Sequence, residues 1–583
     1  MTQGGRSHAV VSREVLRRLM TVSPLLAVFT ACGCAAPGVE KADMVLRNGT
    51  IITVDESLPE AGALAIRGDR IVAVGSSEEI DAYVGDRTEV IDLMGRTAIP
   101  GFIEGHGHFL GVGDARLQLR LMETNSWDEI VAMVADAVSR SRPGELIRGR
   151  GWHQSKWTAP PEPDVEGFPL HHVLSAVSPD NPVILRHASG HATFANAKAM
   201  EMSGVGRDTA DPPGGEILRD AGGNPTGLFR ERASELLEAA TRHATPPDPR
   251  RQAELAAHES LAKGITSFQD AGSSFETVDV LKSMVDRGEL GLRLWVMLRE
   301  PLHRLAELGP NYRMIGYGDN HLTVRAIKRS IDGALGSRGA WLLEPYADLP
   351  DGTGLNTDPV ADVEATAAWA IDNDFQMCVH AIGDRANRET LDIFAKTFAA
   401  HPDKTGLRWR DEHAQHLHPD DIPRFAELGV IASMQGIHCT SDAPYVIARL
   451  GERRAAEGAY VWKSLLDSGA VVSNGTDAPV EDVSPIASFY ATVSRRAKDG
   501  SVFFPRQRLS RMEALRTYTI NAAYAAFEEE IKGSLSAGKL ADITVLSQNI
   551  LTVAEQDLPS TEVTHTIVGG RLMYNRDDRA ARR

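Results

Sequence analysis

Hydrophobic and polar positions follow one pattern at both ends of the chain. Near the start, the runs MVLRNGTIITVD, GALAIRGDRIVAVG and EVIDLMGRTAIPG are short, rich in β-formers and interrupted by Asn-Gly, Gly-Asp and Gly-Arg turns. Near the end, GKLADITVLSQN and VTHTIVGGRLMYN have the same texture. Such runs are typical of strands joined by tight turns. Residues 41–97 and 533–583 together therefore predict one small β-sandwich.

Between these blocks, short apolar runs alternate with amphipathic helical stretches such as 362–373 and 385–400. This alternation predicts parallel strands with crossover helices. The predicted strands are Ala98–Ile103, Ile265–Gln269, Arg293–Leu298, Leu322–Ile327, Gln376–His380, Trp409–His413, Val430–Ser433 and Val471–Asn474. We expect an α/β fold in which residues 98–532 form a (β/α)8 TIM barrel, with catalytic groups at the carboxyl ends of its strands.

The first two predicted strands are separated by about 160 residues, far more than a βα loop needs. We interpret residues of about 110–262 as an insertion after the first barrel strand. It is rich in Gly, Pro and His, as in GWHQSKW and LRHASGHATF. We expect it to cover the mouth of the barrel and to shape a substrate pocket.

The candidate chemistry begins with IPGFIEGHGHFL, at the first predicted barrel strand. His106 and His108 are two residues apart, so on an extended strand both imidazoles point the same way, as two ligands of one metal must. His380, His413 and Asp477 each follow a later strand. Imidazole and carboxylate ligands together suit zinc or another first-row divalent ion. The alternatives are loop or core histidines, and a turn role for Asp477.

Lys328 ends the fourth predicted strand. An ammonium group has no lone pair for a metal, but CO2 can convert the amine into a carbamate whose two oxygens bridge two metals. The alternatives are a solvated lysine or a pair with Asp332.

In this order along the chain, the segments PGFIEGHGH, AIKRSIDGALGSR, VHAIGDRAN, DEHAQ and NGTDAP resemble the amidohydrolase superfamily. They are most similar to its amidohydrolase 3 branch, which includes N-substituted formamide deformylase. The resemblance implies that His106 and His108 bind one metal and that a carbamate on Lys328 bridges to a second. His380 and His413 would hold the second metal, and Asp477 would bind the first. One departure is Glu104-Gly105, where the family usually has an Asp before the His-x-His pair.

A metal-bound hydroxide would then attack the substrate carbonyl, and Asp477 would take the proton of the water and pass it to the leaving nitrogen. We expect one or two zinc ions per chain and hydrolysis of a non-peptide C–N bond in a small N-acylated or N-formylated compound. The alternatives are a metal-dependent deaminase, isomerase or dehydratase of the same superfamily, and a non-catalytic binding lipoprotein. Lys328 favours the hydrolase, because mononuclear deaminases of the superfamily generally lack a lysine there.

Four further side chains are candidates for substrate contact. His153 and His191 lie in the insertion, and Asp384 and Arg385 follow His380; a structural role is an equal alternative for each. His416 and His418 are expected at the surface, in a polar LHPDD stretch that predicts a helix start. His438 and Cys439 follow the seventh strand and receive no role.

The composition of the chain limits the classes of binding partner that we expect. The formal net charge of -17 argues against a nucleic-acid binder. We expect a small-molecule substrate, and a homodimer is the assembly to test. Four cysteines make no disulfide framework.

Residues 1–40 have the composition of an export signal and linker. Arg13, Arg17 and Arg18 precede a short apolar stretch, which is well below the roughly 20 residues that span a bilayer. FTAC resembles a lipobox whose Cys32 would carry a lipid, although Phe29 replaces the usual Leu. The alternatives are a plain cleaved signal and a cytoplasmic protein.

Mass spectrometry of the mature N-terminus distinguishes these outcomes. We expect a chain that begins at Cys32 and carries a lipid, which would place the protein at a bacterial membrane facing the periplasm. Cleavage without lipid would indicate periplasmic or secreted protein. An unmodified chain that begins at Met1 would contradict export.

Overall fold

The computed structural model describes residues 39–242 and 248–577. The predicted signal and Cys32 lie outside these residues. Within the described ranges, none of the helices combines the length and apolar character needed to cross a bilayer.

A barrel of eight parallel strands forms the centre of residues 41–583. Seven neighbouring pairs are hydrogen-bonded ladders, and β24 packs against β8, which nearly closes the ring. In barrel order the strands are β8 (Phe102–Gly107), β17 (Ile265–Ser273), β18 (Arg293–Leu298), β20 (Leu322–Ser330), β21 (Gln376–Ala381), β22 (Arg410–His413), β23 (Ile431–Gln435) and β24 (Val472–Gly475). The TIM-barrel prediction is confirmed, and seven strands lie where the sequence predicts them.

The first predicted strand, Ala98–Ile103, is wrong in its bounds. The structure divides it at Gly101 into β7 (Thr97–Pro100), which belongs to a sheet outside the barrel, and β8. Gly101 allows this break because a Cβ atom there would lie 2.2 Å from the Thr266 hydroxyl oxygen. The backbone of the chain thus passes from one sheet to the other where a side chain has no room.

Helices connect the barrel strands and cover the ring. Predicted helices 362–373 and 385–400 correspond to α11 (Val360–Asp372) and α12 (Asp384–Ala400). The others that pack around the barrel include α2 (Phe109–Asp114), α7 (Pro249–Ala262), α8 (Phe275–Asp286), α9 (Leu302–Tyr312), α13 (Ile422–Leu428), α14 (His438–Leu450), α16 (Trp462–Asp467), α17 (Pro485–Ser494), α18 (Arg511–Thr517) and α19 (Ile520–Ala525).

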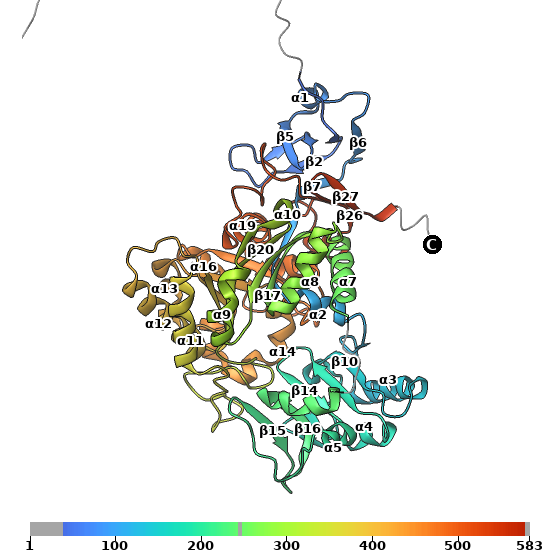
Figure 1. Ribbon diagram of the computed structural model, residues 1–583, viewed down its shortest axis with the longest axis vertical. Coiled ribbons are helices and arrows are strands. Elements are labelled where there is room, and N and C mark those ends of the chain that lie inside the picture. Colours follow the sequence, from blue (N-terminus) through green and yellow to red (C-terminus); the bar gives the residue numbers. More distant parts are fainter. Residues whose placement is uncertain (1–38, 243–247, 578–583) are drawn as a thin grey trace, which may run out of the picture. The chain divides into compact units, whose positions relative to one another are not determined.

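Both ends of the chain build the flanking β-sandwich. One sheet has the order β5-β4-β1-β6, and the other has the order β27-β26-β25-β7-β2-β3. In Figure 1 the blue strand β7 lies in the same sheet as the red strands β26 and β27, and it pairs with β25. Apolar side chains from both ends, including Leu46, Ile66, Ile543 and Ile567, share one core. The bounds are β1 (Met44–Arg47), β2 (Thr50–Ile52), β3 (Glu60–Ala61), β4 (Ala63–Arg67), β5 (Arg70–Gly75), β6 (Glu89–Asp92), β25 (Ile543–Leu546), β26 (Val563–Val568) and β27 (Arg571–Asn575).

The insertion has a sheet and a core of its own. Its strand order is β15-β16-β14-β13-β10-β9, in which β9, β10 and β13 are parallel. Trp127, Trp152 and Phe194 pack in its core. The bounds are β9 (Leu119–Arg120), α3 (Trp127–Arg140), β10 (Ile147–Trp152), β13 (Val183–His187), β14 (Ala192–Ala195), β15 (Gly215–Arg219) and β16 (Pro225–Glu231).

A buried ion pair joins the barrel to the sandwich. Arg293, at the start of β18, donates from Nε and Nη2 to both oxygens of Asp542, over 2.8 and 3.1 Å. Burial acts to raise the pKa of Asp542, but Arg293 outweighs it and holds that pKa below its ordinary value. The pair therefore stabilises the fold at all pH values above the ordinary carboxyl pKa, and its contribution is lost as the pH falls below it.

We expect Arg293→Met to destabilise the fold by about 3–5 kcal/mol, because the Asp542 carboxylate stays buried without its counter-charge. The double variant Arg293→Met/Asp542→Asn removes that charge, so its free energy of unfolding should fall by less than that of the single variant. Urea unfolding followed by circular dichroism at neutral pH measures both. Equal stability of the single and double variants would show that no buried charge is left unpaired.

Candidate active site

Five strands bring the metal-ligand candidates together at the carboxyl end of the barrel. His106 lies on β8, Lys328 on β20, His380 on β21 and His413 at the end of β22, and Asp477 follows β24. His108 directly follows β8. This is the end at which a (β/α)8 barrel holds its active site.

The His-x-His pair faces one carboxylate. Asp477 Oδ1 lies 3.2 Å from Nε2 of His108 and 3.7 Å from Nε2 of His106. One nitrogen or oxygen from each of these three residues lies within 4.8 Å of the others. Asp477 has a φ of 55°, a backbone conformation that non-glycine residues rarely adopt. Residues in such conformations cluster at functional sites.

Glu104, the departure from the family pattern, holds the loop that carries Asp477. Its buried carboxyl group accepts hydrogen bonds from the Thr476 backbone N–H at 2.6 Å and the Thr476 hydroxyl at 3.0 Å. Asp477 N in turn donates to His106 O at 2.8 Å. Burial raises the pKa of Glu104 to about 8. Glu104 is thus a positioning residue, which reaches from β8 to the loop after β24.

A second carboxylate orients His106. Nδ1 of His106 contacts Glu412, which is itself bound at 2.6 Å by Nε of Arg410. A carboxylate at Nδ1 selects the tautomer whose Nε2 lone pair is free for a metal. Glu412 was not among the residues expected from the sequence. Its signal was the two-residue spacing from Arg410, which places both side chains on one face of β22.

His413 and His380 complete the histidine group. The ring of His413 lies 4.6 Å from that of His106 and 4.4 Å from that of His380, between centroids. Nδ1 of His413 contacts Gln435 Oε1 at 2.8 Å, which leaves Nε2 free. Nε2 of His380 is buried and has no hydrogen-bond partner among the described residues.

Lys328 lies in the same buried space. Its Nζ is 3.5 Å from Nε2 of His106. Burial lowers the pKa of the amine to about 8. The alternative pairing with Asp332 is not what the structure has. That carboxylate accepts hydrogen bonds from the backbone N–H groups of Trp341, Ile382 and Gly383.

The protonation states suit metal binding. Burial lowers the pKa of His106 to about 4, and it holds the pKa values of His380 and His413 well below their ordinary value. Burial alone would raise the pKa of Asp477, but the neighbouring histidines, His108 first, outweigh it and lower it. Metal ligation requires neutral imidazoles and an ionised carboxylate. Nε2 of His380 makes no hydrogen bond with the described residues and lies 3.5 Å from Asp332 Oδ1, and together with this donor set it fits a divalent metal.

The insertion brings one of the substrate-contact candidates to the site. The ring of His191 lies 5.0 Å from that of His380, and its Nδ1 contacts Glu231 Oε2 at 2.7 Å. His153 stacks on Tyr445 with ring centroids 5.3 Å apart, next to His187.

Asp384 and Arg385 make other contacts. Asp384 accepts the Leu343 N–H at 2.8 Å, and Arg385 is exposed with its guanidinium 4.5 Å from the Trp341 ring centroid. These observations favour a structural role for both. The surface expectation for His416 is wrong. It is buried against Tyr460 because the chain after β22 turns inward there, whereas His418 caps the short helix that the LHPDD stretch predicts.

His438, which received no role from the sequence, lies at the site. One ligand atom from each of His413, His438 and Asp477 lies within 4.8 Å of the others. Gln415 Nε2 lies 2.8 Å from Nδ1 of His438, and the buried Nε2 has no hydrogen-bond partner among the described residues. The sequence did not predict this role, because His438 is the first residue of α14 and two turn residues separate it from β23.

Comparison with known proteins agrees with this geometry. The model of the amidohydrolase family matches residues 89–574. N-substituted formamide deformylase of Arthrobacter pascens is 29% identical over 92% of this chain and 98% of its own length. The protein LONG AFTER FAR-RED 3 of Arabidopsis thaliana is 36% identical over 91% of this chain and 92% of its own.

Among solved structures, an uncharacterized metal-dependent hydrolase from Pyrococcus horikoshii superposes with a TM-score of 0.69 and 26% identity. The match covers 88% of this chain and 99% of the other. The chain therefore belongs to the amidohydrolase family and is a metal-dependent hydrolase that acts on carbon–nitrogen bonds.

Proposed function

We propose that this enzyme hydrolyses the amide C–N bond of a small N-acylated or N-formylated amine. The observation that carries the proposal is the convergence of four histidines, Lys328 and Asp477 in one space at the carboxyl end of the barrel, where all but the half-buried His108 are buried. The similarity to N-substituted formamide deformylase over nearly both chains supports the choice of substrate class.

The donor set divides into two groups that share the space around Lys328. His106, His108 and Asp477 would hold one divalent metal, zinc being the first choice for imidazole and carboxylate ligands. His380 and His413 would hold a second. A bound metal lowers the pKa of a water molecule to about 7 and polarises the substrate carbonyl.

Lys328 would join the two groups as a carbamate. The ammonium first loses a proton; the neutral Nζ would then attack the carbon of CO2 and lose a second proton, which gives an N-carboxylate. The reaction needs a neutral amine, and burial favours the neutral form. The short distance from Nζ to His106 Nε2 supports a ligand role for the product.

Asp477 would move the proton. Its Oδ1 accepts the proton of the attacking water and then delivers it to the leaving nitrogen, which departs as an amine. His108, His106 and His413 keep the carboxylate ionised, so it is ready to accept.

His191 would orient the substrate. Burial acts against a charge on this imidazole, but Glu231 outweighs it and raises the pKa of His191 above its ordinary value. A protonated His191 can donate a hydrogen bond to the substrate carbonyl oxygen beside His380. We further propose that the protein is exported, as its N-terminal composition indicates.

Metal content tests the ligand assignment. We expect about two metal ions per wild-type chain by elemental mass spectrometry, and fewer in Lys328→Ala, because the bridging carbamate is lost. Lys282→Ala, at an exposed lysine that pairs with Asp286, is the matched control and should keep the wild-type content. One ion, unchanged in Lys328→Ala, would favour the deaminase or isomerase alternative. No metal after reconstitution would contradict the proposal.

Asp477→Asn tests the proton transfer. We expect kcat for N-alkylformamides to fall by about 10²–10⁴-fold, because the amide cannot accept the proton of the water. Formate release measures the rate, and metal analysis of the same sample separates lost ligation from lost catalysis. Asp420→Asn, at an exposed carboxylate, is the control. Turnover near that of the wild type in a metal-loaded variant would rule out this role.

A further inference from the structure

Three arginines form a ladder across the insertion sheet. In the parallel register, Arg120 on β9 is opposite Arg150 on β10, which is opposite Arg186 on β13. Residues opposite each other in a sheet share a face, and like charges so placed are destabilising. Three arginine side chains therefore leave the sheet on the same face at opposite positions, where a sheet ordinarily avoids like charges.

No carboxylate of the described residues forms a close ion pair with this ladder, although Asp114 acts at longer range on both Arg150 and Arg186. Among the described residues, no Asp or Glu oxygen lies within 4.0 Å of a guanidinium nitrogen of Arg120, Arg150 or Arg186. The partners of the ladder are neutral carbonyl groups. Arg150 donates from Nε to Pro479 O at 3.1 Å and from Nη2 to Ala188 O at 3.3 Å. Arg186 donates from Nε and Nη2 to Gly190 O at 3.3 and 3.2 Å.

These carbonyl groups place two of the arginines beside the site. Pro479 is two residues from Asp477, and Gly190 precedes His191, whose ring lies against that of His380. Nη1 of Arg150 and Nη1 of Arg186 make no hydrogen bond in the described part of the chain and stay available as donors. Arg186 is also solvent-exposed. The positive charge of the ladder thus borders the space where a substrate must lie.

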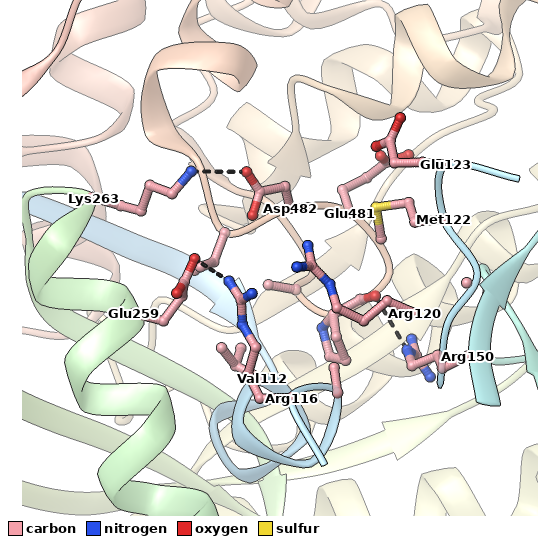
Figure 2. A pocket seen from close by; sticks show the side chains of 15 residues that line it. Val112, Arg116, Arg120, Met122, Glu123, Arg150, Glu259, Lys263, Glu481 and Asp482 are labelled. Atoms are coloured by element: carbon pink, nitrogen blue, oxygen red, sulfur yellow. Dashed lines mark hydrogen bonds and ion pairs between the residues drawn. The ribbon is translucent and has the colours of Figure 1, made fainter. Parts of the chain in front are cut away.

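Arg120 and Arg150 both line a cavity of about 210 Å³ between α2, α7 and the loop after β24 (Figure 2). Two other cations that line this cavity are already paired, Arg116 with Glu259 and Lys263 with Asp482. Glu123 and Glu481 also line it, but neither makes an ion pair with the ladder in the described residues. The three arginines of the ladder are therefore the cations here that have no direct carboxylate partner among the described residues.

We propose that Arg150 and Arg186 form an anion subsite, so that the substrate carries a carboxylate or phosphate group at the end remote from the C–N bond. Guanidinium groups present paired N–H donors that match the oxygens of both anions. An oxyanion between the two would remove the repulsion that the sheet otherwise bears. That the anionic group lies remote from a hydrolysed C–N bond rests on the proposed function. The preference of the site for an anionic ligand does not.

The test is calorimetric binding to the metal-loaded wild-type enzyme. The probes are 5-oxohexanoate, in which a methylene replaces the amide nitrogen of an N-acyl amino acid, the matched phosphate monoester, and neutral 2-hexanone. We expect an anionic probe to bind about 10- to 100-fold more tightly than the ketone. Arg150→Met and Arg186→Met should each remove most of this advantage without changing the affinity for 2-hexanone. Arg186→Lys should keep part of it.

Arg140→Met, at an exposed arginine of α3, is the control and should bind as the wild type does. The anion that binds more tightly identifies the substrate group as carboxylate or phosphate. Equal affinity for charged and neutral probes would overturn the proposal. So would an equal loss for both kinds of probe in the arginine variants, because arginines that only hold the loop of His191 act that way. Arginine-dependent anion binding without formamide hydrolysis would refute the proposed substrate bond and leave the subsite standing.

Discussion

Removal of water from the carboxyl end of the barrel is the constraint on which the site depends. Burial makes a charged imidazole or ammonium unfavourable, so the histidines and Lys328 tend toward the neutral forms that have lone pairs. Asp477 stays ionised because imidazoles surround it. The same burial would be costly without compensation, and Glu412 with Arg410 and Glu104 with Thr476 provide it through close hydrogen bonds.

Much of this arrangement could be predicted from the sequence because a barrel turns order along the chain into position in space. A polar residue after each apolar strand must lie at one end of the ring, so His380, His413 and Asp477 could be grouped before any contact was known. The family resemblance then gave Lys328 a role that its side chain alone does not suggest.

Other features depend on contacts between distant segments, which no local pattern records. Glu231, at the end of β16, contacts His191, which lies just before the neighbouring strand β14. Gln415, which follows β22, contacts His438 at the start of α14. The burial of His416 follows from the path of a loop and not from its polar neighbours. The bounds of β7 and β8 were missed because Pro100 and Gly101 indicate a bend, but a bend alone does not show that the chain passes there from one sheet to another. The residues that the sequence did not predict are thus those that orient or enclose the metal-ligand candidates. The candidates themselves could be predicted.

The sandwich also constrains the order in which the molecule can be assembled. Strand β7 pairs with β25, whose residues lie more than four hundred positions later. While a ribosome makes the chain, the edge of β7 that pairs with β25 stays unpaired until residues 543–546 have emerged. A prematurely ended chain would therefore keep the strand that leads into the His-x-His motif as an exposed edge open to pairing with other chains.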